Sequence, residues 1–236
     1  MMECVGGDVP VNKGDKFSRE QAPKTDQEKL EMADNPYASL VGSLMTAHWV
    51  AGKKIMRYLQ RTKDFKIVYK RNESLELVGY AYADFAGCVD NLKSTSGFVF
   101  LFGGAAVSWK SVKQSIVTTS TMQAEFIACY EATCQAIWLK NFLTGLKVLG
   151  IIEKPIQIWN DNNSAILFAK GNKRSIGGKP LSLKFLSVKE KISEGSTAMD
   201  YINTESNLAD PFNKGLPNNV FKRHVTSMGV LSGFDA

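Results

Sequence analysis

Cysteine and histidine are scarce in this 236-residue chain, and their spacing excludes several kinds of site. The sequence contains only Cys4, Cys88, Cys129, Cys134, His48 and His224. No two cysteines form a CxxC pair, so the ligand spacing of a structural zinc site is absent. Catalysis by a Ser/His or Cys/His pair is not expected either, and the chain carries no P-loop or dinucleotide-binding glycine motif. Scattered cysteines are typical of a reducing compartment.

Long apolar segments are also missing. No run approaches the roughly 20 residues that a membrane-spanning helix needs. The N-terminal residues MMECVGGDVP lack the basic-then-apolar order of a signal peptide. We therefore expect an intracellular protein, cytoplasmic or nuclear, that is not secreted and has no membrane partner.

Acidic residues are fewer than basic ones, but only by a small margin. The chain has 29 lysines and arginines against 23 aspartates and glutamates, a formal charge of +6. Such a balance favours nucleic acid through phosphate neutralisation, although a small excess supports this only beside a motif. Residues 36–62 show a helical pattern with one basic face, made by Lys53, Lys54, Arg57 and Arg61. A solvated surface is the simpler interpretation of that face.

The order of the predicted elements indicates an α/β fold with a mixed sheet. Residues 1–34 are polar and lack periodicity, which predicts a flexible, partly disordered N-terminal extension. Residues 66–118 hold short β-branched and aromatic runs that favour antiparallel strands. A long helix follows over residues 120–146, with an alanine stripe suited to packing on a sheet. The runs PIQIWN and STAMDYI predict two more strands, and DNNSAILFAK, residues 181–193 and the region from NLADPFNKGL predict helices.

Three acidic residues stand out by their positions. Glu125 lies in the first turns of the long helix, Asp161 directly follows a strand, and Asp210 is near the start of the final helix. Carboxylates from such separate elements can hold two Mg²⁺ ions, which take hard oxygen ligands and act together on a phosphodiester. Each residue alone also has a structural explanation: a helix dipole for Glu125, a helix cap for Asp161, and an ion pair with Lys214 for Asp210.

Several words along the chain resemble a single family. They are YADFAGC at 82–88, KSTSGFVFLFGGAAVSWKS at 93–111, STMQAEFIACYEA at 120–132, DNNSAI at 161–166 and NLADPFNKGL at 207–216. In this order they resemble the ribonuclease H domain of copia-type retrotransposon Pol polyproteins. Residues 14–45 resemble the linker that precedes that domain in the same polyproteins. The resemblance covers nearly the whole chain.

The resemblance implies a ribonuclease H-like fold, in which helices flank a mixed five-stranded sheet. It divides the chain into the extension at 1–34, a helical remnant of the reverse transcriptase end or connection at 35–65, and a ribonuclease H-like domain at 66–230. It also implies hydrolysis of RNA within RNA–DNA hybrids by two Mg²⁺ ions on four carboxylates, in a protein fused to reverse transcriptase. Three of these catalytic, metal-binding carboxylates fall on Glu125, Asp161 and Asp210.

The fourth carboxylate is missing. A family word resembling GYSDADWAG stands here as GYAYADFAG at 79–87, so Tyr82 takes the place of the residue that would bridge both metals. A phenol, whose ordinary pKa is about 10, does not replace a carboxylate. Asp84 is only a weak substitute, because two residues along a strand span about 6.6 Å.

Two further departures concern the flanking regions. The words around Met45 and His48 are nearly fused, as if a longer segment at the end of the reverse transcriptase region were deleted. A family word similar to KHIDIKF stands here as KPLSLKF at 179–185, without its histidine and aspartate. The Asp-Asp motif of the polymerase is absent, so the chain is not expected to synthesise DNA by itself.

Three hypotheses remain open. The chain is an impaired ribonuclease H-like domain that still binds RNA–DNA hybrid or other nucleic acid, an active hybrid-specific endoribonuclease, or a decayed transposon fragment. Candidates for nucleic-acid contact lie in or beside the strand region that carries Tyr82. They are Lys93, Ser94, Thr95, Ser96, Lys110, Lys113 and Gln114. An ordinary polar hairpin explains any one of them equally well.

Overall fold

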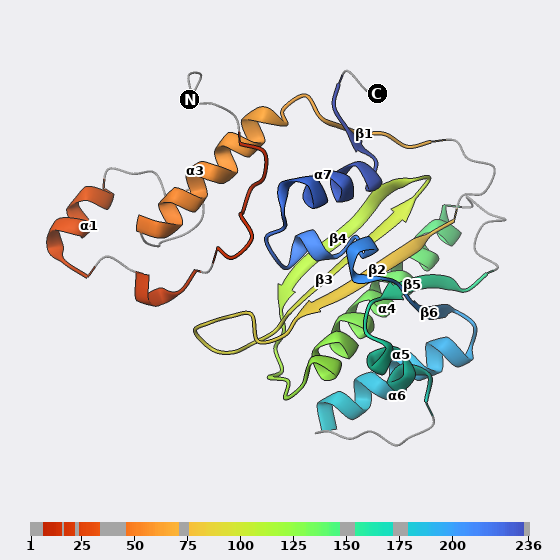
Figure 1. Ribbon diagram of the computed structural model, residues 1–236. Coiled ribbons are helices and arrows are strands. Elements are labelled where there is room, and N and C mark those ends of the chain that lie inside the picture. Colours follow the sequence, from red (N-terminus) through yellow and green to blue (C-terminus); the bar gives the residue numbers. More distant parts are fainter. Residues whose placement is uncertain are drawn as a thin grey trace.

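A five-stranded mixed sheet forms the centre of the protein, as a computed structural model shows (Figure 1). The structure describes residues 7–15, 17–21, 24–33, 46–70, 76–146, 154–171 and 179–233. The strands lie in the order β4 (Ala105–Lys113), β3 (Thr95–Phe102), β2 (Val78–Asp84), β5 (Ile156–Asn160) and β6 (Thr197–Tyr201). The first three are antiparallel, whereas β2–β5 and β5–β6 are parallel pairs. The expected mixed five-stranded sheet is therefore confirmed.

Local sequence explains the hairpin and the long helix. Gly103 and Gly104 both have positive φ, 60° and 77°, which the tight turn between β3 and β4 requires. Helix α4 (Thr121–Gly145) begins after Ser120, whose side chain accepts a hydrogen bond from the Gln123 backbone N–H. Its alanine stripe at 124, 128, 132 and 136 is buried, which allows the helix to approach the sheet closely. The predicted helix over 120–146 is confirmed.

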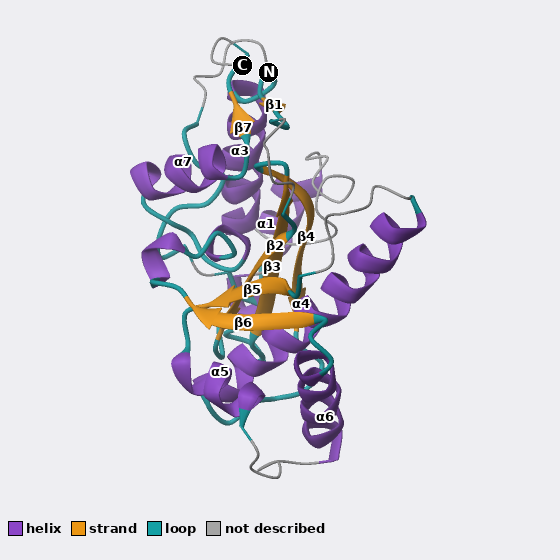
Figure 2. Ribbon diagram, turned by 90° about the vertical axis from the view of Figure 1, so that its right-hand side faces the viewer, coloured by secondary structure: helices purple, strands orange, loops and turns teal. Residues whose placement is uncertain are grey.

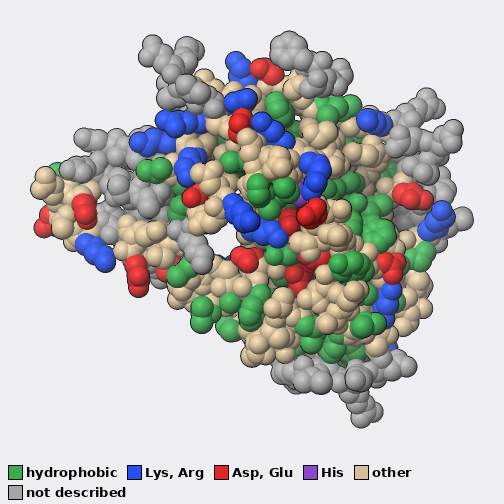
Figure 3. All heavy atoms as spheres, viewed as in Figure 1, with side chains coloured by type: hydrophobic (Ala, Val, Ile, Leu, Met, Phe, Trp, Pro, Cys, Tyr) green, Lys and Arg blue, Asp and Glu red, His purple; other side chains and the backbone are tan. Residues whose placement is uncertain are grey.

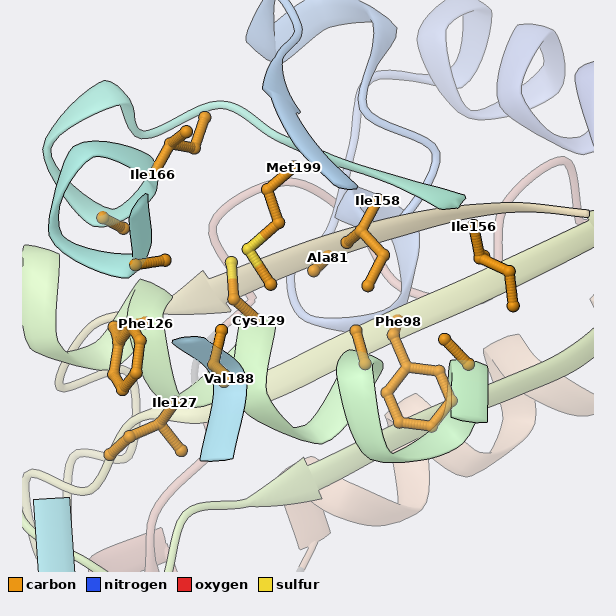
Figure 4. Packing of buried hydrophobic residues seen from close by; sticks show 14 of the residues in the cluster. Ala81, Phe98, Phe126, Ile127, Cys129, Ile156, Ile158, Ile166, Val188 and Met199 are labelled. Carbon is orange, nitrogen blue, oxygen red and sulfur yellow. The ribbon is translucent and has the colours of Figure 1, made fainter. Parts of the chain in front are cut away.

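Helices cover both faces of the sheet (Figure 2). The larger core lies between one face of the sheet and the helices α4, α5 (Asn163–Lys170) and α6 (Lys179–Ser193). Phe98, Cys129, Ile158 and Met199 belong to this core (Figure 4). The opposite face packs beneath α7 (Asn218–Ser227) and the 3-10 turn η3 (Asp210–Phe212). None of the helices in the described part of the chain is long and apolar enough to cross a membrane.

Ion pairs link residues 7–15 to two helices. The N-terminal part of the described chain contains η1 (Arg19–Gln21), α1 (Asp26–Ala33) and α3 (Thr46–Arg61). Asp8 forms ion pairs with Arg61 of α3 and Lys222 of α7, and Asp15 pairs with Lys54. Within the extension expected at residues 1–34, residues 7–15 therefore contact α3 and α7. The boundaries proposed at residues 34 and 65 stay predictions, and the junction at residues 34–45 lies outside the described residues.

The run KIVYKR does not join the meander that its composition predicts. Within residues 66–70, the part of this run that the structure describes, Lys66–Ile67 form a strand, β1, which pairs antiparallel with β7 (Val230–Leu231) in a separate two-stranded sheet. The short turn η2 (Thr204–Ser206) follows β6 and leads the chain back over the sheet toward η3. The long connection after β6 therefore brings Asp210 to the end of β2.

Candidate active site at the end of strand β2

The candidate site lies where β2 and β5 separate. Their parallel pairing extends only over Val78–Tyr80 and Gln157–Trp159. Beyond it, the side-chain amides of Asn160 and Asn207 both donate to the backbone carbonyl of Ala81, at 3.0 and 2.9 Å. β2 has an antiparallel neighbour on one side and a parallel one on the other, and ligand sites of α/β sheets lie at such points of divergence.

Glu125 reaches this opening from α4. Its side chain is buried, and Oε2 accepts hydrogen bonds from the Ala83 backbone N–H and the Asn160 amide, both at 3.0 Å. Burial raises the pKa of Glu125 to about 8, and the nearby charges of Asp161 and Asp210 act in the same direction. The two hydrogen bonds oppose that shift but do not cancel it. Glu125 is therefore a positioned carboxyl group with a proton affinity far above that of an exposed glutamate.

Asp161 directly follows β5 and is not the helix cap. Asn162 is the cap of α5, because its side-chain oxygen accepts from the Ala165 backbone N–H at 3.0 Å. Asp161 lies close enough to raise the pKa values of Glu125 and Asp210 by charge repulsion. A single strand end thus supplies a cap for one helix and a charge for the candidate site.

Asp210 contributes the third carboxylate from η3. It does not lie at the start of the final helix, as the sequence predicted, because Pro211 follows it in a short 3-10 turn and α7 begins only at Asn218. Its side chain is buried, and burial raises its pKa. The Oδ2 atom pairs with the Lys214 ammonium at 2.8 Å, as one reading of the sequence anticipated. The Oδ1 atom is buried and has no hydrogen-bond partner among the described residues.

The side chain of Tyr82 contacts Lys214, the residue that also pairs with Asp210. The Lys214 ammonium lies 3.4 Å from the phenol oxygen and 4.4 Å from the ring centroid. Burial raises the pKa of Tyr82 to about 12, and the charges of Asp210 and Glu125 add to the effect of burial. The phenol is therefore neutral at physiological pH. Tyr82 responds to the charges of Asp210 and Glu125, and Glu125 responds to that of Asp161, so the four side chains lie around one site in which position 82 supplies no carboxylate.

The chain has relatives among transposon proteins, although no family model matches it. The Pol polyprotein of transposon TNT 1-94 from Nicotiana tabacum is 34% identical over 242 residues, which cover 92% of this chain and 18% of that polyprotein. The homologues of this chain include copia-type retrotransposon Pol polyproteins. The chain spans less than a fifth of this Pol relative.

Two other similar proteins match a smaller part of this chain. Secreted RxLR effector protein 161 from Plasmopara viticola is 45% identical over 92 residues, which cover 39% of this chain and 65% of that protein. Among solved structures, LC11-RNase H1 in complex with an RNA/DNA hybrid is 15% identical, with a TM-score of 0.42 over 58% of this chain and 94% of that chain.

Asp84, the other acidic residue of the word at 79–87, lies against the loop that follows β2. Its Oδ2 atom occupies the space that a side chain on Gly87 would need, in the loop after β2. Across the described ranges, no three or more His, Cys, Asp or Glu side chains are grouped so that they could hold a metal ion as they stand. The nearest cation to Asp210 is instead the ammonium of Lys214.

Three of the candidate nucleic-acid residues are internal. Ser94, Ser96 and Gln114 are buried, and the Gln114 amide donates to the Ser96 hydroxyl and the Ala124 carbonyl. Ser94 is hydrogen-bonded with Thr118. These contacts tie the end of β4 to α4, so the expectation that the three side chains reach phosphates is not supported. Lys110 and Lys113 are exposed, while Lys93 and Thr95 are half-buried.

Three asparagines that build the site were not predicted from the sequence. Asn160 and Asn207 fill the gap between β2 and β5, and the Asn213 amide donates to the Tyr82 backbone carbonyl at 2.9 Å. Of the three, only Asn160 could have been predicted to be buried from the sequence, because it continues the alternation that buries Ile156 and Ile158. The other two lie in irregular segments whose position depends on tertiary contacts.

Proposed function

We propose that this chain is a ribonuclease H-like domain of a Pol polyprotein in which two-metal hydrolysis of the RNA strand of RNA–DNA hybrids is impaired. Tyr82 carries the proposal. It stands where the resemblance requires a carboxylate, and its half-buried phenol stays protonated at physiological pH. The carboxylates that remain are Glu125, Asp161 and Asp210, which mark the ancestral site.

In this reaction magnesium would act as a Lewis acid on the phosphodiester and would activate water. The three carboxylates would be its oxygen ligands. The unpartnered, buried Oδ1 atom of Asp210 suits a cation. Two divalent ions do not fit this side-chain arrangement, however. Tyr82 adds bulk without charge, Asp84 faces the loop, and Lys214 already occupies one oxygen of Asp210. Ground-state binding of hybrid needs none of these ions, so we propose that nucleic-acid binding outlasts cleavage.

Basic side chains favour retained binding. In Figure 3 they gather over α3 and α7 and adjoin acidic side chains near the middle of the same face. Exposed members include Lys53, Arg57 and Arg223. Phosphates of a duplex are attracted to such a surface, and the attraction weakens as salt rises.

The direct test is cleavage of a labelled RNA–DNA hybrid in Mg²⁺ by the unmodified chain, Tyr82→Asp and Tyr82→Asp/Glu125→Gln. We expect no cleavage by the unmodified chain, measurable cleavage by Tyr82→Asp, and its loss in the double variant. Cleavage by the unmodified chain that disappears in Glu125→Gln would establish the active enzyme instead. Failure of every variant to cleave or to bind hybrid would favour a decayed fragment.

A further inference from the structure

Lys214 lies between Asp210 and Tyr82, yet the two-metal chemistry that the resemblance implies assigns it no task. Its ammonium is 2.8 Å from Asp210 Oδ2, 3.4 Å from the Tyr82 hydroxyl and 4.4 Å from the centroid of the Tyr82 ring. The Lys214 side chain is 33% exposed, whereas that of Asp210 is 5% exposed. One cation thus contacts a buried carboxylate, a hydroxyl and an aromatic face at the same time.

This arrangement offsets a cost of the acidic site. A buried carboxylate without a counter-charge is strongly destabilising, and Asp161 adds negative potential beside Asp210. In a two-metal site, divalent ions balance such charges. Here the counter-charge for Asp210 comes from the protein itself, as an ammonium with three donor hydrogens.

Tyr82 suits this cation better than it suits a metal. Its ring face attracts an ammonium at close range, and its hydroxyl oxygen can accept a hydrogen bond. The substitution that removes a metal ligand therefore supplies two contacts for Lys214. In this chain Tyr82 and Lys214 are in direct contact.

The backbone of Lys214 is held from both sides. On one side, the Asn213 amide donates to the Tyr82 carbonyl, and its side chain fills the space over Gly97 where a Cβ would approach within 2.7 Å. On the other side, the Asn12 carbonyl of the N-terminal segment lies where a side chain on Gly215 would stand. The contacts of Asn213 and Gly215 therefore fix the backbone on both sides of Lys214 and hold its ammonium beside Asp210.

We propose that Lys214 is the resident cation of this site, so that the domain folds and keeps its site geometry without a divalent metal ion. The proposal deepens the proposed loss of two-metal cleavage, because it names what replaces the metal. It assigns Lys214 a positioning and charge-balancing role and no part in a reaction.

The test measures thermal unfolding in EDTA and in Mg²⁺, together with Mn²⁺ binding by electron paramagnetic resonance. The variants are Lys214→Met and the matched control Lys222→Met, whose lysine pairs with Asp8 at 3.4 Å on an exposed surface. The unmodified chain should have the same Tm in EDTA and Mg²⁺. Lys214→Met should have a lower Tm that Mg²⁺ restores, and its Mn²⁺ affinity should rise by about tenfold or more. Lys222→Met should behave like the unmodified chain.

Two further variants cover the case in which Lys214→Met does not fold. Lys214→Arg keeps a cation and should show no metal response, and Asp210→Asn/Lys214→Met removes both charges and should fold in EDTA. Saturable stabilisation of the unmodified chain by Mg²⁺, or equal behaviour of Lys214→Met and Lys222→Met, would overturn the proposal. Cleavage is not a readout, so a nuclease-active unmodified chain would refute the proposed impairment without deciding this point.

Discussion

Asn160 donates its side-chain amide to Glu125 Oε2 at 3.0 Å, across the space between the end of β5 and α4. The same amide donates to the Ala81 carbonyl at 3.0 Å, so a single side chain links a strand, its neighbour and a helix. Glu125 has little access to water and receives a second hydrogen bond from the Ala83 N–H. Its carboxyl group is therefore fixed in place at a substantial cost when it is charged.

That cost predicts a pH-dependent stability. The folded-state pKa of Glu125 is raised from 4.5 to about 8, so between these values the folded state binds more protons than the unfolded state. Stability from this group is therefore full below about pH 4.5 and falls as pH rises toward 8. Urea unfolding of Glu125→Gln should show a flatter profile over this window, with a difference of a few kcal/mol, on the order expected for such a shift.

An exposed carboxylate provides the control for this measurement. Glu76→Gln removes an acid that is 57% exposed and pairs with Lys154 at 3.5 Å. Its profile should follow that of the unmodified chain. If Glu125→Gln and the unmodified chain had parallel profiles between pH 4.5 and 8, Glu125 would be ionised in the folded state with an ordinary pKa.

Regular elements of this fold follow from sequence, whereas the contacts that close the site do not. Ser120 and the alanine stripe at four-residue spacing predicted α4, because caps and helical periodicity are local properties. The resemblance selected Glu125, Asp161 and Asp210, and the structure brings them near Tyr82. Asn213 was not predictable, since its contact with Tyr82 joins residues far apart in the chain through a 3-10 turn.

The same limitation explains the error at Ser94, Ser96 and Gln114. Polar residues in a strand region can face solvent or satisfy one another inside, and composition does not distinguish the two. Only the packing of α4 against β4 shows that the Gln114 amide is needed by the Ala124 carbonyl. Fold class was therefore more accessible from sequence than the direction of individual polar side chains.

Gly97→Ala should disturb the site through Asn213. A Cβ at position 97 would approach both polar side-chain atoms of Asn213 within 2.7 Å, so that side chain must move and lose its bond to the Tyr82 carbonyl. Loss of one hydrogen bond and the accompanying strain should lower the free energy of unfolding by about 1–3 kcal/mol. Chemical denaturation measures this change.

Gly145→Ala is the matched control for that substitution. A Cβ at Gly145 meets nothing within 4 Å, and the residue ends helix α4. Alanine there should leave stability unchanged or raise it by up to about 1 kcal/mol, because glycine is the poorer helix former. Equal effects of the two substitutions would show that Asn213 adjusts freely and that the loop carrying Lys214 is not clamped.

Hybrid binding should depend on Lys113 and not on Ser96, although both were candidates for phosphate contact. Lys113 is exposed at the end of β4, next to Cys88 Sγ at 2.9 Å, whereas Ser96 is buried and accepts a hydrogen bond from Gln114.

Fluorescence anisotropy with a labelled RNA–DNA hybrid across a salt series separates the two roles. Lys113→Gln should weaken binding and reduce the slope of log K against log salt by about 1, the change expected for one lost phosphate contact. Ser96→Ala should lower stability and leave that slope unchanged, and Lys154→Gln, just before β5 at the opposite end of that strand from the site, should alter neither. An unchanged slope in Lys113→Gln would remove this hairpin from the binding surface and leave α3 and α7 as the basic surface to test.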